Sequence, residues 1–295
     1  MNGFFNVLKP PGMSSGQVVG AVRRLLDGEK AGHAGTLDPE AAGVLPVMAG
    51  KAARLFDYLV DKRKTYVAEI AFGAATDTQD AQGRIIETGE NYPDMDAVRA
   101  VLPMFRGVIL QAPPSYSAIK QNGQRLYDLA RKGQMVAAEP RPILVEEIAV
   151  LQAMENHGMM LRIACGKGTY VRTLCHDIGR AVNCPAHMRF LLRAQSGAFS
   201  LETASTLEEL RQAREENRLE ARLLPMDMPL AHLSRAEVPG HLATACRNGG
   251  KMSLSAFPGL EAVAEDAPFR LYLDGSFMGI AHHREGTISF RVMVG

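Results

Sequence analysis

The 295-residue sequence has no tryptophan, and aromatic residues make up only 6% of it. It also has no excess of charge of either sign, because 33 lysines and arginines stand against 32 aspartates and glutamates. Phosphate binding is largely electrostatic, and many nucleic-acid-binding domains are strongly basic. A formal net charge of +1 therefore argues against binding by overall charge, and any basic surface has to be local.

Cysteines are few and hydrophobic runs are short. The four cysteines form no C-x-x-C pair and no zinc-type spacing, so we expect small buried hydrophobic residues in a reducing compartment. The apolar run from Phe4 to Leu8 is too short for the core of a signal peptide, and no stretch approaches the length of a membrane span. We therefore expect a soluble, cytoplasmic protein without a metal site.

The composition that is present, 46% hydrophobic and 22% charged, suits a globular chain with one large core or two unequal cores. The charge is sorted along the chain. Residues 202–220 hold six glutamates against three arginines, which is typical of a solvated, salt-bridged helix face. Residues 120–132 hold four basic residues against one aspartate. In the net charge of the chain, the acidic segment therefore offsets the basic one.

Hydrophobic periodicity predicts an α+β fold. Helical spacing predicts helices over residues 16–27, 39–58, 95–105 and 125–132, and after the turn at 166–168. Alternation predicts strands over residues 66–72, 84–87, 143–151 and 159–165, with a loop at 74–83. Because no βαβ repeat is visible, we expect a mixed, mainly antiparallel sheet flanked by helices and loops.

The texture of the sequence changes near Ser234. Short segments punctuated by glycine follow, including Asn248-Gly249-Gly250 and Asp274-Gly275-Ser276. They predict a small β-rich domain over residues 234–295, joined through the proline-containing stretch 224–229. Residues 1–230 then form the larger domain.

The most informative segment is residues 31–45, AGHAGTLDPEAAGVL. Gly32 and Gly35 permit backbone conformations closed to other residues, and Pro39 suits the first position of a helix. Asp38 is then expected at the helix N-cap, where it accepts backbone N–H bonds. The same position also suits an ionised nucleophile or base at the edge of a cleft, and spacing alone leaves both interpretations open.

Residues 33–46, HAGTLDPEAAGVLP, resemble the signature loop of the TruB family of tRNA pseudouridine synthases. Further resemblances follow in family order across roughly residues 4–200: NVLKPPGMSS at 6–15, KTY at 64–66, PSYSAIK at 114–120, GTYVRTL at 168–174 and FLLR at 190–193. Residues 234–295 resemble a PUA-like RNA-binding domain more weakly, through NGGK at 248–251 and GSFMGIA at 275–281.

The resemblance implies conversion of uridine to pseudouridine at position 55 of the tRNA T-loop by a bacterial, stand-alone enzyme. It implies that Asp38 is the catalytic residue and that Arg172 pairs with it. The other residues that it places at the substrate are His33, Tyr66, Tyr170 and Leu191, with Tyr66 and Leu191 enclosing the flipped base. It further implies no cofactor, no metal, no obligate protein partner and a monomer that binds the T-stem-loop.

The segment at about 115–142 resembles the family's RNA-binding insertion. Candidate contacts to the RNA backbone are Lys120, Arg125, Arg131, Arg141 and Arg193. Two positions depart from the family's pattern, because Leu192 stands where an arginine is frequent and Ala42 where threonine or serine is frequent. A phosphate contact is therefore expected to be missing.

Two other classes of function compete with this interpretation. A non-catalytic RNA-binding protein would keep the basic insertion and the C-terminal domain without needing Asp38 and Arg172. A glycoside hydrolase needs two carboxylates in one site, and we expect only Asp38 to have a loop built around it. Asp80, in the loop 76–80, is expected to be a turn former, although the resemblance places its loop near the site.

Overall fold

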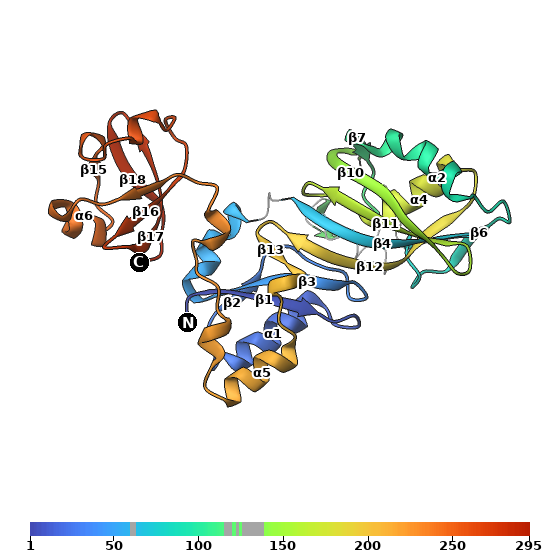
Figure 1. Ribbon diagram of the computed structural model, residues 1–295, viewed down its shortest axis with the longest axis horizontal. Coiled ribbons are helices and arrows are strands. Elements are labelled where there is room, and N and C mark those ends of the chain that lie inside the picture. The colour runs from blue at the N-terminus through green and yellow to red at the C-terminus, as the bar shows by residue number, and fades with distance from the viewer. Residues whose placement is uncertain (60–62, 115–119, 122–123, 126–138) are drawn as a thin grey trace.

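The computed structural model describes residues 1–59, 63–114, 120–121, 124–125 and 139–295, and it is built on two main sheets (Figure 1). The larger sheet has nine strands. Its main path runs in the order β1 (Gly3–Lys9), β3 (Ala42–Ala49), β12 (Ala186–Ser196), β4 (Lys64–Phe72), β11 (Gly158–Cys165), β10 (Arg141–Met154) and β7 (Gly107–Gln111). β2 (Ala31–His33) pairs with β3, and β13 (Phe199–Ser200) pairs with β12. Every pair in this sheet is antiparallel except β3 with β12, so the predicted α+β class is confirmed.

Helices cover the two halves of this sheet separately. α2 (Met95–Val101) and α4 (Val171–Ala181) pack on the half formed by β4, β10, β11 and β12. α1 (Ser15–Leu25) and α5 (Leu207–Glu215) pack on the N-terminal half, around β1 and β3. The helices on the two halves therefore belong to separate hydrophobic clusters, and a third cluster packs on β1, β3 and β13 through Phe4, Val44 and Phe199.

The predicted helix over 16–27 is confirmed by α1. Ser14 caps it by accepting the N–H of Gln17, while the Gln17 side chain accepts the N–H of Ser14. Val18 and Val22 are buried one turn apart, as the helical period requires.

The predicted helix over 39–58 is wrong. Residues 39–40 form a turn, residues 42–49 form strand β3, and a 3-10 helix follows at Gly50–Tyr58. A strand buried on both faces is a continuous apolar run, and periodicity cannot separate such a run from a buried helix. Gly43 shows why the strand needs glycine: its φ is +114°, and a Cβ there would lie 2.3 Å from the carbonyl oxygen of Arg193.

The predicted strands at 66–72, 143–151 and 159–165 correspond to β4, β10 and β11. The loop at 74–83 is shorter than expected, since β5 (Ala74–Thr76) pairs with β6 (Ile85–Thr88). β7 lies in a stretch for which no element was predicted. Of the helix predicted at 125–132, Arg125 instead lies in β9 (Gln124–Arg125), paired with β8 (Lys120–Gln121), and the rest lies outside the described residues.

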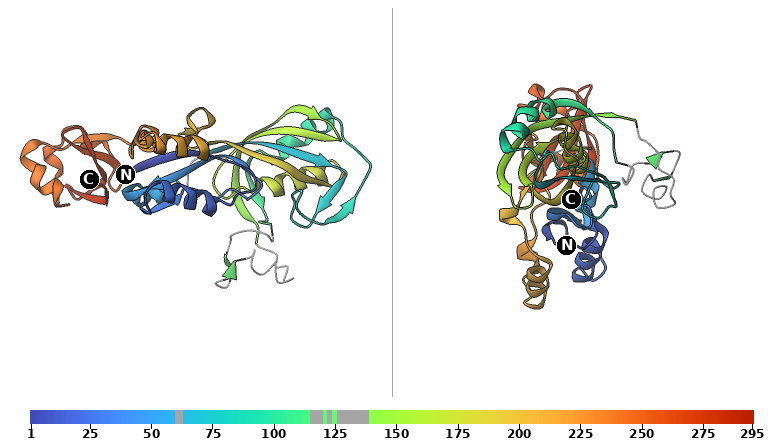
Figure 2. Two further views of the ribbon diagram at one scale, coloured as in Figure 1. Left: turned by 90° about the horizontal axis from the view of Figure 1, so that it is seen from below. Right: turned by 90° about the vertical axis from the view of Figure 1, so that its right-hand side faces the viewer.

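The second sheet has five strands and lies at one end of the molecule (Figure 2). Its order is β14 (Arg235–Glu237), β16 (Phe269–Leu273), β17 (Ser276–Arg284), β18 (Thr287–Met293) and β15 (Met252–Ser253), with α6 at Ala243–Arg247. The predicted β-rich C-terminal region is therefore present. Ile280 and Val294 pack in one cluster with Phe4 and Leu55, so the two sheets share buried side chains.

The remaining elements are short 3-10 helices. They lie at Leu102–Phe105, Leu201–Thr203, Leu219–Arg222, Met228–Leu230, Gly240–Leu242, Leu254–Ala256 and Leu260–Ala262. None of the helices in the described ranges is both long and apolar enough to cross a bilayer.

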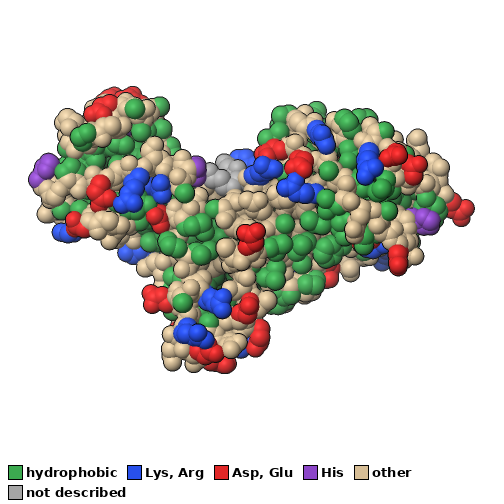
Figure 3. Space-filling view, in the orientation of Figure 1, with side chains coloured by type: hydrophobic (Ala, Val, Ile, Leu, Met, Phe, Trp, Pro, Cys, Tyr) green, Lys and Arg blue, Asp and Glu red, His purple; other side chains and the backbone are tan. Residues whose placement is uncertain are grey.

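Charged side chains of both signs are interspersed over α5, at the lower edge of the molecule in Figure 3. Arg211 pairs with Glu208 and Arg214 pairs with Asp27 of the neighbouring segment, so the solvated, salt-bridged helix face is confirmed. All four cysteines are buried and free, as expected.

Candidate active site

Asp38 lies in the turn that joins β2 to β3. Its carbonyl oxygen accepts the N–H of Ala41, and its carboxylate is partly exposed, with 42% of the side chain accessible. The predicted helix N-cap at Asp38 is wrong, because no helix starts there. Gly35 has a φ of +93°, as expected, whereas Gly32 has an ordinary φ. The carboxylate is therefore not used up in capping, and it faces solvent from a tight turn.

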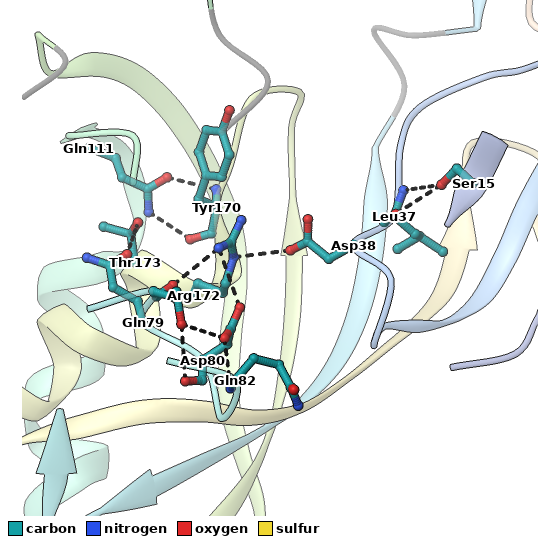
Figure 4. A network of polar contacts seen from close by, with 11 residues as sticks. Ser15, Leu37, Asp38, Gln79, Asp80, Gln82, Gln111, Tyr170, Arg172 and Thr173 are labelled. Carbon is teal, nitrogen blue, oxygen red and sulfur yellow. Dashed lines mark hydrogen bonds and ion pairs between the residues drawn. The ribbon is translucent and has the colours of Figure 1, made fainter. Parts of the chain in front are cut away.

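Arg172, the second residue of α4, holds this carboxylate from the other half of the sheet. Its Nε lies 3.1 Å from Oδ2 of Asp38, while Nη1 lies 3.4 Å from Oδ2 of Asp80 and donates to the carbonyl oxygen of Thr78 at 3.2 Å (Figure 4). Only 7% of the Arg172 side chain is exposed. One buried guanidinium therefore binds two carboxylates, and the pairing expected between Arg172 and Asp38 is present.

The loop between β5 and β6 presents Asp80 to this arginine. The Asp80 carboxylate accepts the hydroxyl of Thr78 at 2.6 Å and the N–H of Gln82 at 3.0 Å. The expectation that Asp38 alone has a loop built around it is therefore wrong, because a second carboxylate shares its cation. Asp80 is closed in by local donors, however, while Asp38 is the more exposed of the two.

The opening motif at residues 6–15 holds the Asp38 turn. Fully buried Lys9 donates from Nζ to the carbonyl oxygens of Pro39 at 2.7 Å and Ala41 at 2.6 Å. The hydroxyl of Ser15 accepts the N–H of Leu37 and donates to its carbonyl oxygen. Sequence reasoning assigned no role to Lys9 or Ser15, although both lie in a motif that it quoted.

Arg193 binds main-chain atoms of the segment that contains the Asp38 turn. Its predicted contact to the RNA backbone is wrong. The side chain is 0% exposed, because Nε donates to the carbonyl oxygen of Val44 and the two Nη atoms donate to those of Thr36 and Gly35. Burial raises the pKa of the Tyr66 hydroxyl, while the charge of Arg193, which also hydrogen-bonds this hydroxyl, opposes the rise. Arg193 is thus a structural cation beneath the site.

The two departures from the family's pattern are neighbours in space. Leu192 of β12 pairs in parallel register with Ala42 of β3, and its side chain is half-buried. The next residue back, Leu191, is buried in one hydrophobic cluster with Tyr66 and Leu37. Because Leu191 and Tyr66 are each more than nine-tenths buried, a base can stack between them only if these side chains or the Asp38 turn move.

The other predicted site residues lie on several different elements of the fold. His33 ends β2 and is half-buried, and desolvation together with the charge of Arg193 lowers its pKa. Tyr170 immediately precedes α4, and in Figure 4 its ring projects away from the Arg172 network. Arg141 is exposed at the start of β10. Lys120 and Arg125 lie on β8 and β9, and Arg131 lies outside the described residues.

Burial lowers the pKa of Lys9 to about 8, with the charge of Arg193 adding to this effect and the charges of Glu40 and Asp38 opposing it. In the unfolded chain a lysine titrates near pH 10.4, so between about pH 8 and pH 10.4 the unfolded state binds more protons than the folded state. The free energy of unfolding contributed by Lys9 therefore rises with pH across this window. Below pH 8 both states are protonated, and the contribution is constant.

We accordingly expect the wild type to gain stability relative to Lys9→Met as the pH is raised from 7.5 to 9.5. Denaturant unfolding of both proteins at each pH measures the difference. A difference independent of pH would show that Lys9 stays charged in the folded state throughout.

Two family models match consecutive parts of the chain. A family model described as the N-terminal domain of TruB family pseudouridylate synthase matches residues 23–171. A second, described as the C-terminal domain of tRNA pseudouridylate synthase B, matches residues 172–231. Residues 232–295, which contain the five-stranded sheet, lie beyond both matches.

Curated relatives are similar over most of the chain. The chain is 44% identical to tRNA pseudouridine synthase B of Alkaliphilus oremlandii over 85% of its own length and 83% of the relative's. It is 37% identical to the protein of the same name from Clostridioides difficile over 95% and 94%.

Solved structures are similar over nearly the whole chain. A Cbf5-Nop10-Gar1 complex contains a chain with a TM-score of 0.75 and 27% identity, covering 99% of this chain and 84% of that one. An H/ACA RNP bound to a substrate RNA that contains 2′-deoxyuridine contains a chain with a TM-score of 0.73 and 26% identity, with the same coverage.

Proposed function

The chain belongs to the TruB family of pseudouridylate synthases, and on this premise we propose that it acts at position 55 in the T-loop of tRNA with Asp38 as its catalytic residue. The chain has the activity of its family: it is an isomerase that converts uridine to pseudouridine in tRNA. The observation that carries the proposal is the partly exposed Asp38 carboxylate paired with buried Arg172.

The reaction needs no net oxidation or reduction. The glycosidic bond between N1 of uracil and the sugar carbon breaks, the base turns, and its C5 forms a bond to the same sugar carbon while the proton on C5 is lost and N1 gains one. A uridine stacked in a folded loop cannot be reached in place, so it has to be flipped into the protein at a cost of a few kcal/mol. Stacking and phosphate contacts offset this cost.

In this proposal Asp38 attacks the sugar or removes a sugar proton. Arg172 orients the carboxylate through the ion pair between Nε and Oδ2 and leaves the second carboxylate oxygen for the substrate. Asp80 and Thr78 fix the other end of the guanidinium, so the catalytic carboxylate is held without being enclosed. Such prior positioning is what converts a weak carboxylate into an effective catalyst.

Four further residues contact the substrate in this proposal. Tyr66 and Leu191, which share a cluster beside the Asp38 turn, enclose the flipped uracil. His33 and Tyr170 contact the RNA at the rim, where both are partly accessible. Residues 1–230 form the catalytic domain, residues 115–142 its RNA-binding insertion, and residues 234–295 a PUA-like RNA-binding domain.

We also propose that the enzyme works alone, as a cytoplasmic monomer without a cofactor or a metal. The curated relatives bear the name of a single synthase, whereas the solved neighbours are parts of complexes. Within the described residues, no group of three or more histidine, cysteine, aspartate or glutamate side chains could hold a metal ion.

Pseudouridine formation in an unmodified tRNA transcript tests the position and the independence from cofactors together. We expect product at one T-loop uridine, with chelator present and nothing else added. A transcript with cytidine at that position is the matched control and should give none. Product at another uridine would refute the T-loop assignment, and tight binding without product would favour the non-catalytic alternative.

The insertion is tested separately by its salt dependence. Neutralising Lys120, Arg125 and Arg131 together should reduce the slope of log K against log salt by about two to three, because each phosphate contact contributes about one. Affinity for tRNA is measured between 50 and 200 mM salt. Neutralising Arg211, Arg214 and Arg218 near α5 is the matched control, and an unchanged slope in the first variant would remove the insertion from the interface.

A further inference from the structure

Gln111, the last residue of β7, binds both main-chain groups of Tyr170. Its Nε2 donates to the Tyr170 carbonyl oxygen at 3.1 Å, and its Oε1 accepts the Tyr170 N–H at 2.8 Å. Figure 4 shows the amide lying flat against the backbone at this point, like a short piece of β-ladder made by a side chain. Gln111 is 2% exposed, so these bonds are sheltered from water.

The start of α4 depends on this contact. Tyr170 occupies the N-cap position with an extended backbone, φ −101° and ψ 107°, and its side chain makes no capping hydrogen bond. A helix start without its own cap is held less firmly than one with a serine, threonine, asparagine or aspartate cap. Gln111 supplies the missing anchor from a strand 59 residues earlier in the chain.

Two residues beyond this anchor stands Arg172. The first turn of α4 is tied at three points: Tyr170 to Gln111, Arg172 to the carboxylates, and Thr173 to Gln79, whose amide oxygen accepts the Thr173 hydroxyl at 2.8 Å. The carbonyl oxygen of Tyr170 also accepts the N–H of Leu174 at 3.1 Å, so the peptide unit after the tyrosine is held from within the helix as well. Gln111 adds hydrogen bonds from outside the helix to the peptide units on both sides of the tyrosine.

We propose that Gln111 is a positioning residue for the reaction. It sets the direction of the Tyr170 side chain and the position of Arg172 relative to Asp38. The inference rests on the proposed function, in which Tyr170 and Arg172 serve the uridine. A displacement of about 1 Å at a catalytic group can cost about a hundredfold in rate. Loss of this anchor should therefore lower kcat rather than weaken tRNA binding.

The first test is Gln111→Met, which keeps an unbranched side chain of similar length and removes both hydrogen bonds. We expect kcat to fall by about ten- to a hundredfold, while KM for tRNA changes by less than about threefold. Gln152→Met is the control for the same exchange: Gln152 lies on β10, the strand paired with β7, and its amide donates to the sulfur of Met154 rather than to α4. Its kcat should stay near that of the wild type.

The second test is Gln111→Glu, followed across pH. A protonated carboxyl group has one donor and one acceptor, so it can replace both amide bonds, whereas a carboxylate can only accept. Burial raises the pKa of a carboxyl group, which brings the titration of this side chain into the neutral range. The ratio of the variant's kcat to that of the wild type should rise as the pH falls from about 8.5 to 6, whereas Gln111→Met should show a ratio independent of pH.

These outcomes separate the inference from the function on which it rests. Wild-type kcat in Gln111→Met, or a ratio for Gln111→Glu that does not change with pH, would overturn the role of Gln111 while leaving Asp38 untouched. Full turnover in Asp38→Asn would instead overturn the proposed function. Thermal melting of each variant verifies that the protein compared is folded.

Discussion

The Asp38→Asn variant is expected to form pseudouridine at least about a thousandfold more slowly than the wild type, since removing a catalytic nucleophile or base typically costs 10⁴-fold or more. Asparagine has the shape of aspartate, and its amide oxygen can still lie against Nε of Arg172, which holds the side chain in place. The turn itself is held by Lys9 and Ser15, which bind main-chain atoms on either side of position 38. Affinity for tRNA should therefore stay within about threefold.

Glu40→Gln provides the matched control for this variant. Glu40 lies two residues further along the same turn and is exposed, and the substitution removes one negative charge just as Asp38→Asn does. It should retain nearly full turnover. Single-turnover measurement of product with each variant in excess over tRNA checks both, and a rate for Asp38→Asn within tenfold of the wild type would rule out Asp38 as the catalyst.

The second large effect is expected at Arg172. Lysine at this position keeps the positive charge, but its one nitrogen cannot occupy the positions of both Nε and Nη1 of the guanidinium, so it cannot reach Asp38, Asp80 and the Thr78 carbonyl oxygen together. Because Asp38 loses its orientation, kcat for Arg172→Lys should fall by about a hundredfold or more.

Arg180→Lys is the control on the same helix. Arg180 lies in the last turn of α4 and is exposed, so the substitution tests the generic effect of exchanging arginine for lysine there. It should leave kcat unchanged. If Arg172→Lys raised KM while kcat stayed at the wild-type value, the arginine would serve tRNA binding rather than the orientation of Asp38.

Sequence patterns predict the α+β class, the strands β4, β10 and β11, and a carboxylate partner for Arg172, which the family resemblance identifies as Asp38. These succeed because alternating burial has a period of two, and because a cation at a helix start needs a carboxylate partner. The same reasoning fails at residues 39–58, where the apolar run of β3 has the composition of a buried helix. A helix and a doubly buried strand differ there only in tertiary context.

Long-range contacts explain the remaining errors. Nothing near Arg193 in the sequence indicates that it lies beneath the Asp38 turn, since its partners Gly35, Thr36 and Val44 come from a distant segment. The same is true of Asp80, whose second role as a partner of Arg172 depends on how the β5–β6 loop lies against α4. An exposed arginine at a phosphate and a buried arginine at carbonyl oxygens have the same sequence signature.

The parallel pairing of β3 with β12 has a consequence for biosynthesis. Arg193 and Val44, which this pairing brings together, are 149 residues apart in the chain. The contacts from Lys9 and Ser15 can form early in translation, whereas those from Arg172 and Arg193 have to wait until their strands and helix leave the ribosome. A nascent chain that ends before Arg172 contains the whole signature loop at residues 33–46, but it lacks the arginine that orients Asp38. Premature termination therefore yields inactive fragments rather than a small working enzyme.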